Sequence, residues 1–268
     1  MTLVGPTRIW VVRHGDRLDF EIGKDKWEAV AQRLHDPVLS DLGHIQAQET
    51  ASAIHAADPT VTRVISSPFL RCIQTSNPIA GKFGCKLCID DSLFEVVYTT
   101  ELFPPLHERA HYFPRIDLDY ISEPRPAADE AFPSAAMVRY GEAAFALAEK
   151  NADQNSIVLC THAAGVSAIV AALCVLKIRD LKPVHPASLF CLELVPGGDT
   201  YSLVENFSGS IEHFSTPQGK TLPWPRDDST DDWGLKWLDC GDSAQWLGER
   251  ERKKGENVKS GCSFSGSL

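Results

Sequence analysis

Short apolar runs with the composition of buried strands alternate with helical stretches along the first 210 residues. The runs rich in Val, Ile, Leu and Cys are expected as strands over residues 8–12, 61–66, 156–160, 187–194 and 201–207. The intervening stretches are expected as helices over residues 41–57, 68–80, 134–151 and 163–175. Strands without apolar/polar alternation are typical of a mainly parallel sheet covered on both faces. The order predicts an α/β fold, a three-layer α/β/α sandwich with a mostly parallel central sheet.

Two regions depart from this alternation. Residues 98–133 carry six prolines and little periodicity, which indicates an insertion that runs over the surface near the active site. Residues 216–268 hold 8 basic and 9 acidic side chains and four of the six tryptophans. We therefore expect one domain over residues 1–215, followed over residues 216–268 by a polar, Trp-containing tail that is at most partly ordered.

The charge of the chain excludes several classes of partner. Lys plus Arg total 26 against 36 Asp plus Glu, a net charge of −10. An acidic chain repels the phosphates of nucleic acids and anionic lipids, so neither is expected as a partner. No apolar run reaches the ~20 residues of a membrane span, and the N-terminus lacks a signal-peptide layout. Several of the eight cysteines lie in apolar runs, so reduced thiols and a cytoplasmic location are expected.

Basic side chains follow three of the predicted strands, where ligands bind in open α/β sheets. Arg13, His14 and Arg17 follow the first strand, Arg71 lies shortly after the second, and His162 comes after the strand over 156–160. Arginine forks match the oxygens of phosphate or carboxylate groups, so this edge is expected to bind an anion.

Glycines and one acidic residue complete the expected site. Gly15 and Gly165 are expected to let backbone N–H groups approach a ligand. Neighbouring arginines should hold a histidine neutral and nucleophilic. Glu95 follows the short apolar run Leu93-Phe94 and is a candidate proton donor at a strand end.

Three motifs carry a family resemblance. They are Val12-Arg13-His14-Gly15, then Ser66-Ser67-Pro68 with Arg71-Cys72 and Gln74-Thr75, and finally Thr161-His162-Ala163. Together they resemble the histidine phosphatase (phosphoglycerate mutase-like) superfamily, over about residues 8–207. The resemblance implies a phosphatase without cofactor or metal, which hydrolyses phosphate esters through a covalent phosphohistidine.

The resemblance also implies a role for each site residue. His14 would be the nucleophile, while Arg13, Arg71 and His162 would hold the phosphate oxygens. Glu95 would protonate the leaving alcohol and later activate water. Because His14 would act neutral and Glu95 protonated, a bell-shaped rate profile against pH is expected.

Arg17 indicates which subfamily of the histidine phosphatase superfamily the chain most resembles. With Leu93-Phe94-Glu95 it most resembles the phosphatase domain of the TULA/STS proteins, in which Arg17 would be a further phosphate ligand. That likeness implies a homodimer and a phosphotyrosine-like or other bulky phosphate ester as substrate. The apolar residues of the insertion point the same way, namely Leu102, Phe103, Tyr112 and Phe113. Arg17 pairing with Asp19 or Glu21 is the alternative that the residues leave open.

Three other functions remain as alternatives. One is a catalytically idle phosphate-binding or interaction module. Another is a phosphoglycerate-type mutase, which is disfavoured because Arg17 and Phe20 stand where mutases usually carry a small hydroxyl residue and an asparagine. The third is a zinc protease, since residues 107–111 read His-Glu-Arg-Ala-His and fit H-E-x-x-H. Prolines at 104, 105 and 114 leave little room for the helix that the zinc motif needs.

Overall fold

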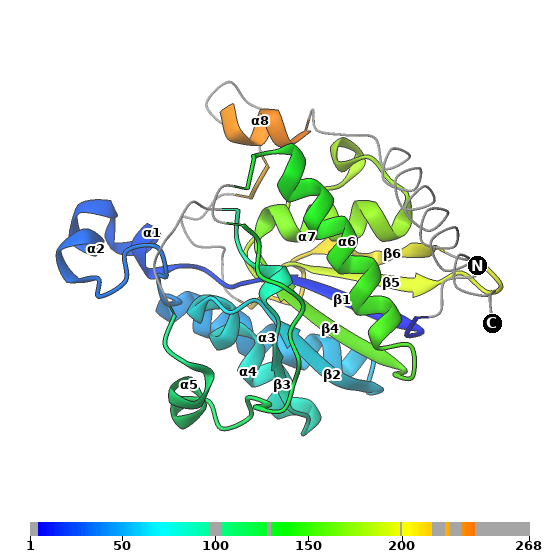
Figure 1. Cartoon of the computed structure of the whole chain (residues 1–268), viewed down its shortest axis with the longest axis horizontal. Coiled ribbons are helices and arrows are strands. Elements are labelled where there is room, and N and C mark those ends of the chain that lie inside the picture. The colour runs from blue at the N-terminus through cyan, green and yellow to red at the C-terminus, as the bar shows by residue number, and fades with distance from the viewer. Residues whose placement is uncertain are drawn as a thin grey trace, which may run out of the picture.

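The computed structural model describes residues 5–96, 103–127, 130–198, 200–215, 223–225 and 232–238. Within them the chain forms six strands and eight α-helices (Figure 1). The strands are β1 (Arg8–Arg13), β2 (Val61–Ser66), β3 (Leu87–Ile89), β4 (Ser156–Thr161), β5 (Leu189–Leu194) and β6 (Tyr201–Ser210). The helices are α1 (Leu18–Ile22), α2 (Lys24–Val30), α3 (Asp41–Ala57), α4 (Leu70–Phe83), α5 (Leu106–Tyr112), α6 (Ser134–Lys150), α7 (Ala163–Cys174) and α8 (Asp232–Leu238).

The strands form one mixed sheet in the order β3-β2-β4-β1-β5-β6. The first four are mutually parallel, and β5 and β6 add antiparallel pairs at one edge. Helices α3 and α4 cover one face, and α6 and α7 cover the other (Figure 1). The predicted three-layer α/β/α sandwich with a mostly parallel sheet is therefore confirmed.

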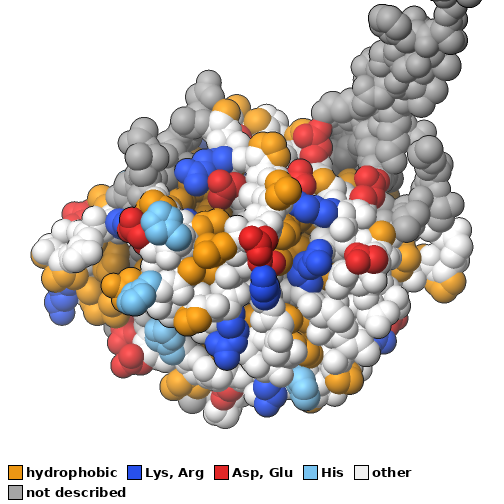
Figure 2. All heavy atoms as spheres, turned by 60° about the horizontal axis from the view of Figure 1, so that its bottom comes forward, with side chains coloured by type: hydrophobic (Ala, Val, Ile, Leu, Met, Phe, Trp, Pro, Cys, Tyr) orange, Lys and Arg blue, Asp and Glu red, His pale blue; other side chains and the backbone are white. Residues whose placement is uncertain are grey.

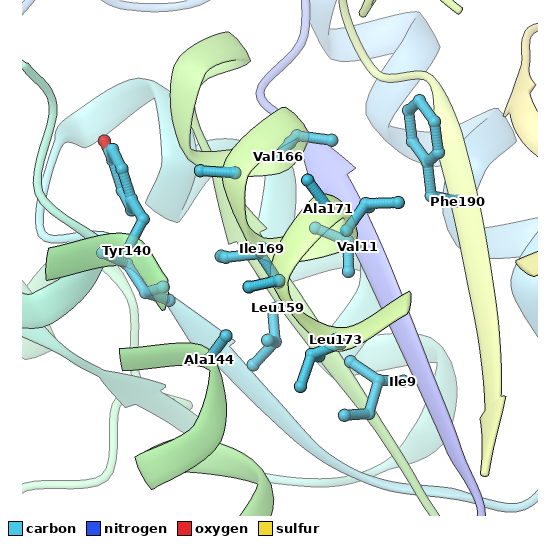
Figure 3. Packing of buried hydrophobic residues seen from close by; sticks show 14 of the residues in the cluster. Ile9, Val11, Tyr140, Ala144, Leu159, Val166, Ile169, Ala171, Leu173 and Phe190 are labelled. Atoms are coloured by element: carbon cyan, nitrogen blue, oxygen red, sulfur yellow. The ribbon is translucent and has the colours of Figure 1, made fainter. Parts of the chain in front are cut away.

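Both faces of β1 are buried, because its alternate side chains enter two different cores. Ile9 and Val11 pack with α6 and α7 in the cluster of Figure 3, whereas Trp10 and Val12 pack with α3 and α4. A strand without a solvent-facing side has no polar positions, which explains the continuous apolar run in the sequence.

The predicted start of α4 at Pro68 is wrong by two residues. The helix begins at Leu70, and its N-cap residue Phe69 has no capping side chain. Instead, the Asp36 carboxylate accepts a hydrogen bond from the Leu70 backbone N–H at 2.8 Å. This acceptor is 34 residues away along the chain, so no local pattern could locate the start.

The segments outside the regular alternation add further elements. The short helices α1 and α2 follow β1 and were not predicted. The expected insertion over residues 98–133 contains α5, and its residues 97–102, 128 and 129 lie outside the described part. Helices α1, α2 and α5 all project at the end of the sheet to which the parallel strands point (Figure 1).

The described part of the tail packs on the domain. Trp224 exchanges two backbone hydrogen bonds with Val184. Trp237 of α8 is fully buried in the core beside α7, and its indole N–H donates to Ser167 Oγ at 2.9 Å. The predicted domain boundary at residue 215 stays a prediction, since most of residues 216–268 lie outside the described part. Within the described ranges, every helix is too short or too polar to serve as a membrane span.

Replacing Trp237 with alanine is expected to lower the free energy of unfolding by about 3–5 kcal/mol, the usual cost of deleting a buried aromatic side chain. The matched control is Trp233→Ala on the same helix, where the side chain is 53% exposed and the loss should be much smaller. Urea unfolding of the full chain measures both. Equal losses in the two variants would show that α8 does not anchor the tail.

Candidate active site

The segments that follow β1, β2 and β4 meet at the end of the sheet where the parallel strands have their carboxyl ends. Arg13 lies opposite Thr161 in the β1–β4 pair, and Ser66 lies opposite Cys160 in the β2–β4 pair. His14, Ser67 and His162 therefore stand at or next to the carboxyl ends of neighbouring strands. The imidazole rings of His14 and His162 are 5.4 Å apart between centroids.

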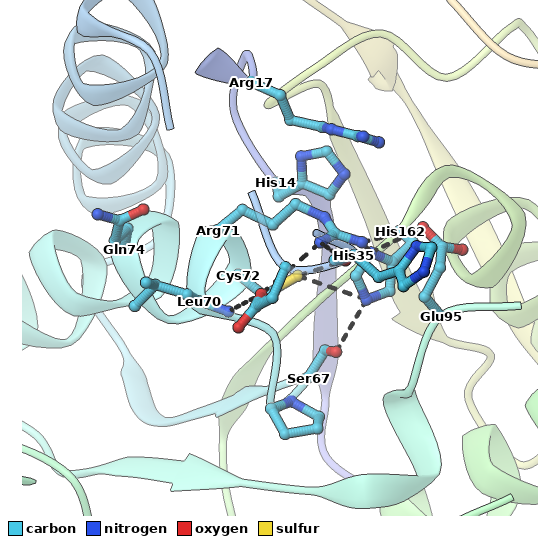
Figure 4. A network of polar contacts seen from close by, with 12 residues as sticks. His14, Arg17, His35, Ser67, Leu70, Arg71, Cys72, Gln74, Glu95 and His162 are labelled. Atoms are coloured by element: carbon cyan, nitrogen blue, oxygen red, sulfur yellow. Dashed lines mark hydrogen bonds and ion pairs between the residues drawn. The ribbon is translucent and has the colours of Figure 1, made fainter. Parts of the chain in front are cut away.

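The structure brings together the five residues that the sequence singled out as catalytic. One ring nitrogen each of His14 and His162 and one carboxylate oxygen of Glu95 lie within 4.8 Å of one another. Arg71 Nη2 is 3.2 Å from His162 Nδ1 and 3.4 Å from a Glu95 carboxylate oxygen (Figure 4). Arg13 is buried close enough for its charge to lower the pKa of His14.

His14 is held in one tautomer by the backbone. Its Nδ1 lies 2.8 Å from the Gly15 carbonyl oxygen. A carbonyl only accepts hydrogen bonds, so Nδ1 carries the proton and Nε2 keeps its lone pair in the neutral ring. Burial lowers the pKa of His14 well below its ordinary value, and the charges of Arg71 and Arg13 lower it further. His14 is therefore a neutral imidazole with an unprotonated Nε2.

Two buried arginines supply donors without acceptors. Arg13 Nη1 donates to the Val184 carbonyl at 2.7 Å, and Arg71 pairs with Glu95 and Asp36. The Nε atoms of Arg13 and Arg71 have no hydrogen-bond partner among the described residues, although both are buried. A buried donor without an acceptor costs about 1–3 kcal/mol, which an oxyanion placed between the two guanidinium groups would offset.

Glu95, His162 and Ser67 form a chain of hydrogen bonds. A Glu95 oxygen lies 3.0 Å from His162 Nδ1, and Ser67 Oγ lies 2.8 Å from His162 Nε2. Both ring nitrogens of His162 are thus engaged, so its orientation is fixed. Ser67 belongs to the second sequence motif, from which no role was predicted for it. Its position directly after a strand, the rule that selected His14, is the signal that could have found it.

Glu95 is ionised before a phosphate ester binds. Burial alone would raise the pKa of Glu95, but His162 and Arg71 beside it lower the pKa well below its usual range. For His162, burial alone would lower the pKa, and Cys72 and Glu95 outweigh it. Burial raises the pKa of the Cys72 thiol well above its usual range, so the charge that favours the imidazolium is that of Glu95. These shifts place the proton of the pair on His162, and the expectation that Glu95 is protonated when it acts as the acid stays a prediction.

Two further expectations are corrected by the structure. Leu93 and Phe94 are not a strand: β3 ends at Ile89, and Glu95 comes after a turn of 3₁₀ helix. Hydrogen bonds to the Phe94 carbonyl from Tyr140 and Arg139 hold that segment in place. The Gly15 N–H donates to Thr75 Oγ1 at 3.0 Å, so it is not available to a ligand. Glycine is required at 15 because a Cβ there would lie 2.7 Å from the Gly43 carbonyl oxygen.

Arg17 adopts the pairing that the sequence left open. Its Nε and Nη2 donate to the two carboxylate oxygens of Asp19 at 3.0 and 2.6 Å. The guanidinium still belongs to the basic cluster, because its charge lowers the pKa of His14 and of Arg13.

The H-E-x-x-H segment does not build a site within the described residues. All five positions lie in α5, but His107 and His111 are exposed and join no group of potential metal ligands there. The group close enough to share an ion is His14, Glu95 and His162. Guanidinium groups flank this trio and repel a dication, whereas they attract a phosphate.

Replacing Glu95 with glutamine is expected to lower the pKa of His162, because the carboxylate that favours the imidazolium is lost while the burial remains. His162 should then lose its proton at a lower pH than in the unmodified protein. A titration of the histidine ring signals by NMR measures this, with Glu130→Gln, which removes a carboxylate paired with Arg139, as the control. An unchanged pKa of His162 would contradict the proton placement.

Comparisons with known proteins agree with this geometry. The model of the histidine phosphatase superfamily (branch 1) matches residues 9–206. A curated relative, the mouse (Mus musculus) ubiquitin-associated and SH3 domain-containing protein A, is 28% identical over 153 residues. That match covers 44% of this chain but only 24% of the relative.

Solved structures share the fold at low sequence identity. The ecdysone phosphate phosphatase from Bombix mori, solved with tungstate, has a TM-score of 0.59 at 19% identity, covering 80% of this chain and 97% of that one. A phosphoserine phosphatase from Entamoeba histolytica has a TM-score of 0.51 at 17% identity, covering 77% of this chain and 98% of that one. The family match spans most of the chain and confirms the resemblance drawn from the three motifs. The chain belongs to the histidine phosphatase superfamily, branch 1.

Proposed function

We propose that the chain is a metal-independent phosphomonoesterase that works through a phosphohistidine on His14. The observation that carries the proposal is the fixed tautomer of His14, whose Nδ1 faces the Gly15 carbonyl and whose Nε2 keeps a lone pair beside two buried arginines. Phosphoryl transfer needs mainly positioning and charge stabilisation, and this cluster supplies both.

In the first step, Nε2 of His14 attacks phosphorus and the bond from phosphorus to the ester oxygen breaks. Arg13 and Arg71 hold the phosphate oxygens. The imidazolium of His162, whose two ring nitrogens are engaged by Glu95 and Ser67, stabilises their negative charge. The negative charge of the phosphate raises the proton affinity of Glu95, so the proton shared with His162 at 3.0 Å can pass to Glu95 and on to the leaving oxygen.

In the second step, the Glu95 carboxylate takes a proton from water, and the water oxygen bonds to phosphorus. The bond between phosphorus and Nε2 breaks, which returns the electron pair to His14 and releases phosphate. The proton that Glu95 took from water then passes to His162, which restores the starting state. One carboxylate thus acts first as acid and then as base.

Hydrolysis of p-nitrophenyl phosphate in EDTA tests this function. His14→Ala is expected to lower kcat by at least about 1,000-fold, as expected when a covalent nucleophile is removed. His44→Ala, which removes an exposed histidine of α3, is the matched control and should keep its activity. Activity that survives His14→Ala would contradict the mechanism, and no turnover by the unmodified protein would favour the idle phosphate-binding module.

For the substrate we propose a bulky, aromatic phosphate ester such as a phosphotyrosine-like group. A groove of about 570 Å³ lies between α2, α4 and α5, lined mainly by apolar side chains that include Trp27, Val30, Tyr112 and Phe113. Asp36 also lines it, and the Asp36 carboxylate is 3.8 Å from Arg71 Nη1. Asp36 therefore connects the groove to the proposed phosphate site, because its carboxylate lines the groove and pairs with an arginine of that site.

The surface view is consistent with this position. Figure 2 shows apolar side chains gathered on the left of the visible face, where α2 projects. Of the aromatic residues expected near the mouth, Tyr112 and Phe113 line the groove. Phe103 instead packs on Phe69 and Phe94, and the Phe69 ring lies against His162. Leu102 lies outside the described residues.

Replacing Tyr112 with alanine is expected to lower the preference for a naphthyl phosphate over p-nitrophenyl phosphate, measured as the ratio of the two kcat/KM values. A fall of about fivefold corresponds to losing one aromatic contact. The control is Leu118→Ala, an exposed apolar residue that does not line the groove. An unchanged ratio would show that the groove is not part of the substrate site.

A homodimer, a cytoplasmic location and the absence of nucleic-acid and membrane partners stay predictions.

A further inference from the structure

Arg17 occupies a loop whose backbone is anchored to the segment before α3. The Ser40 N–H donates to the Asp16 carbonyl at 3.0 Å, and the Leu18 N–H donates to the Val38 carbonyl at 3.0 Å. These two bonds flank Arg17 on either side and fix its Cα relative to the sheet edge. Only the side chain of Arg17 then needs to be oriented.

The Asp19 carboxylate provides that orientation. Both of its oxygens are engaged by Arg17, through Nε at 3.0 Å and Nη2 at 2.6 Å, in a planar fork. The two side chains are only 21% and 15% exposed, and the guanidinium also lies 4.2 Å from the centre of the Phe20 ring. The pair is therefore more constrained than an ordinary surface ion pair, whose flexible partners gain little.

The fork leaves one nitrogen of Arg17 unengaged. Nη1 donates to no acceptor in the described part of the chain, while Nε and Nη2 are both used by Asp19. Figure 4 shows the Arg17 side chain running alongside the His14 ring. The charge of Arg17 acts on Arg13 and His14, which places the guanidinium beside the proposed phosphate site.

We propose that Asp19 is a positioning residue, which holds Arg17 so that Nη1 is directed at the phosphate of the substrate. The inference rests on the proposed function, because it takes the phosphate ester to lie next to His14. An arginine oriented in advance loses less conformational freedom when it binds an anion. The carboxylate thus strengthens the binding of an anion although its own charge repels that anion.

A positioning role for Asp19 and a purely electrostatic role predict opposite changes in phosphate affinity when the carboxylate is removed. If Asp19 acted only through its charge, removing that charge would lower the repulsion of the phosphate and tighten binding. If Asp19 positions Arg17, removing it releases the guanidinium and weakens binding. The sign of the change in phosphate affinity therefore separates the two roles.

The experiment compares Asp19→Asn with Glu21→Gln in the full chain. Glu21→Gln removes the same charge two residues further along α1. The Glu21 backbone N–H donates to the Arg17 carbonyl at 3.3 Å, which the substitution leaves in place, whereas the Arg17 guanidinium pairs with Asp19. Three quantities are measured: the Kd of inorganic phosphate by calorimetry, and kcat and KM for p-nitrophenyl phosphate. Asp19→Asn is expected to raise Kd and KM about tenfold, the size of one charge-assisted hydrogen bond, with a much smaller change in kcat. Glu21→Gln should change Kd and KM less than twofold.

Three further variants complete the test. Arg17→Ala should weaken phosphate binding by at least as much as Asp19→Asn, and the double variant should be no weaker than Arg17→Ala alone, since Asp19 acts only through Arg17. Asp19→Glu keeps the charge but moves the carboxylate by one methylene group, so an intermediate loss is expected.

Tighter or unchanged phosphate binding in Asp19→Asn, or additive losses in the double variant, would overturn the inference. The calorimetric Kd reads the role of Asp19 without turnover. A protein that binds phosphate in this pattern but hydrolyses no ester would therefore contradict the proposed function and leave the positioning role supported.

Discussion

Burial of two arginine side chains at the sheet edge is the constraint on which the site depends. Arg13 and Arg71 are 6% and 2% exposed, and a buried charge is tolerated only when polar partners surround it. The partners come from the segment before β5, from the loop before α3 and from the turn after β3, as Val184, Asp36 and Glu95. Each segment therefore contributes to the stability of the site as well as to its shape.

The same constraint explains the protonation of the site. Positive charge from Arg71 and Arg13 favours a neutral His14, and positive charge near Glu95 favours its carboxylate. His162 lies between these groups and carries the proton that the mechanism later needs. A neutral His14 with an unprotonated Nε2 and a protonated His162 nearby thus follow from one arrangement of charges.

The buried strands and the basic residues that follow them were predictable from the sequence, because both depend on short local patterns. A strand buried on both faces must be apolar throughout, so residues 8–12 and 156–160 were visible as runs. The basic residues directly after such runs had to meet at one edge because parallel strands share a direction. This reasoning located Arg13, His14 and His162 without any knowledge of the helices.

What could not be predicted depends on contacts between distant residues. Asp36 fixes the start of α4 from 34 positions away, and Ser67 orients His162 across 95 positions. The ionised state of Glu95 also depends on neighbours that only the fold brings together. The role of Gly15 was misjudged for the same reason, since the close approach of Gly43 has no signature in the local sequence.

The central claim is that the phosphoryl group is bonded transiently to Nε2 of His14. Trapping the phosphoenzyme tests this claim most directly. p-Nitrophenol leaves without needing a proton, so Glu95→Gln should still form the phosphoenzyme from its ester but hydrolyse it slowly. After an alkaline quench, which preserves the bond between phosphorus and nitrogen, mass spectrometry should find the phosphoryl group on His14, and NMR should place it on Nε2. Turnover with a phosphoryl group on another residue, or with none trapped in Glu95→Gln at any time, would contradict the account.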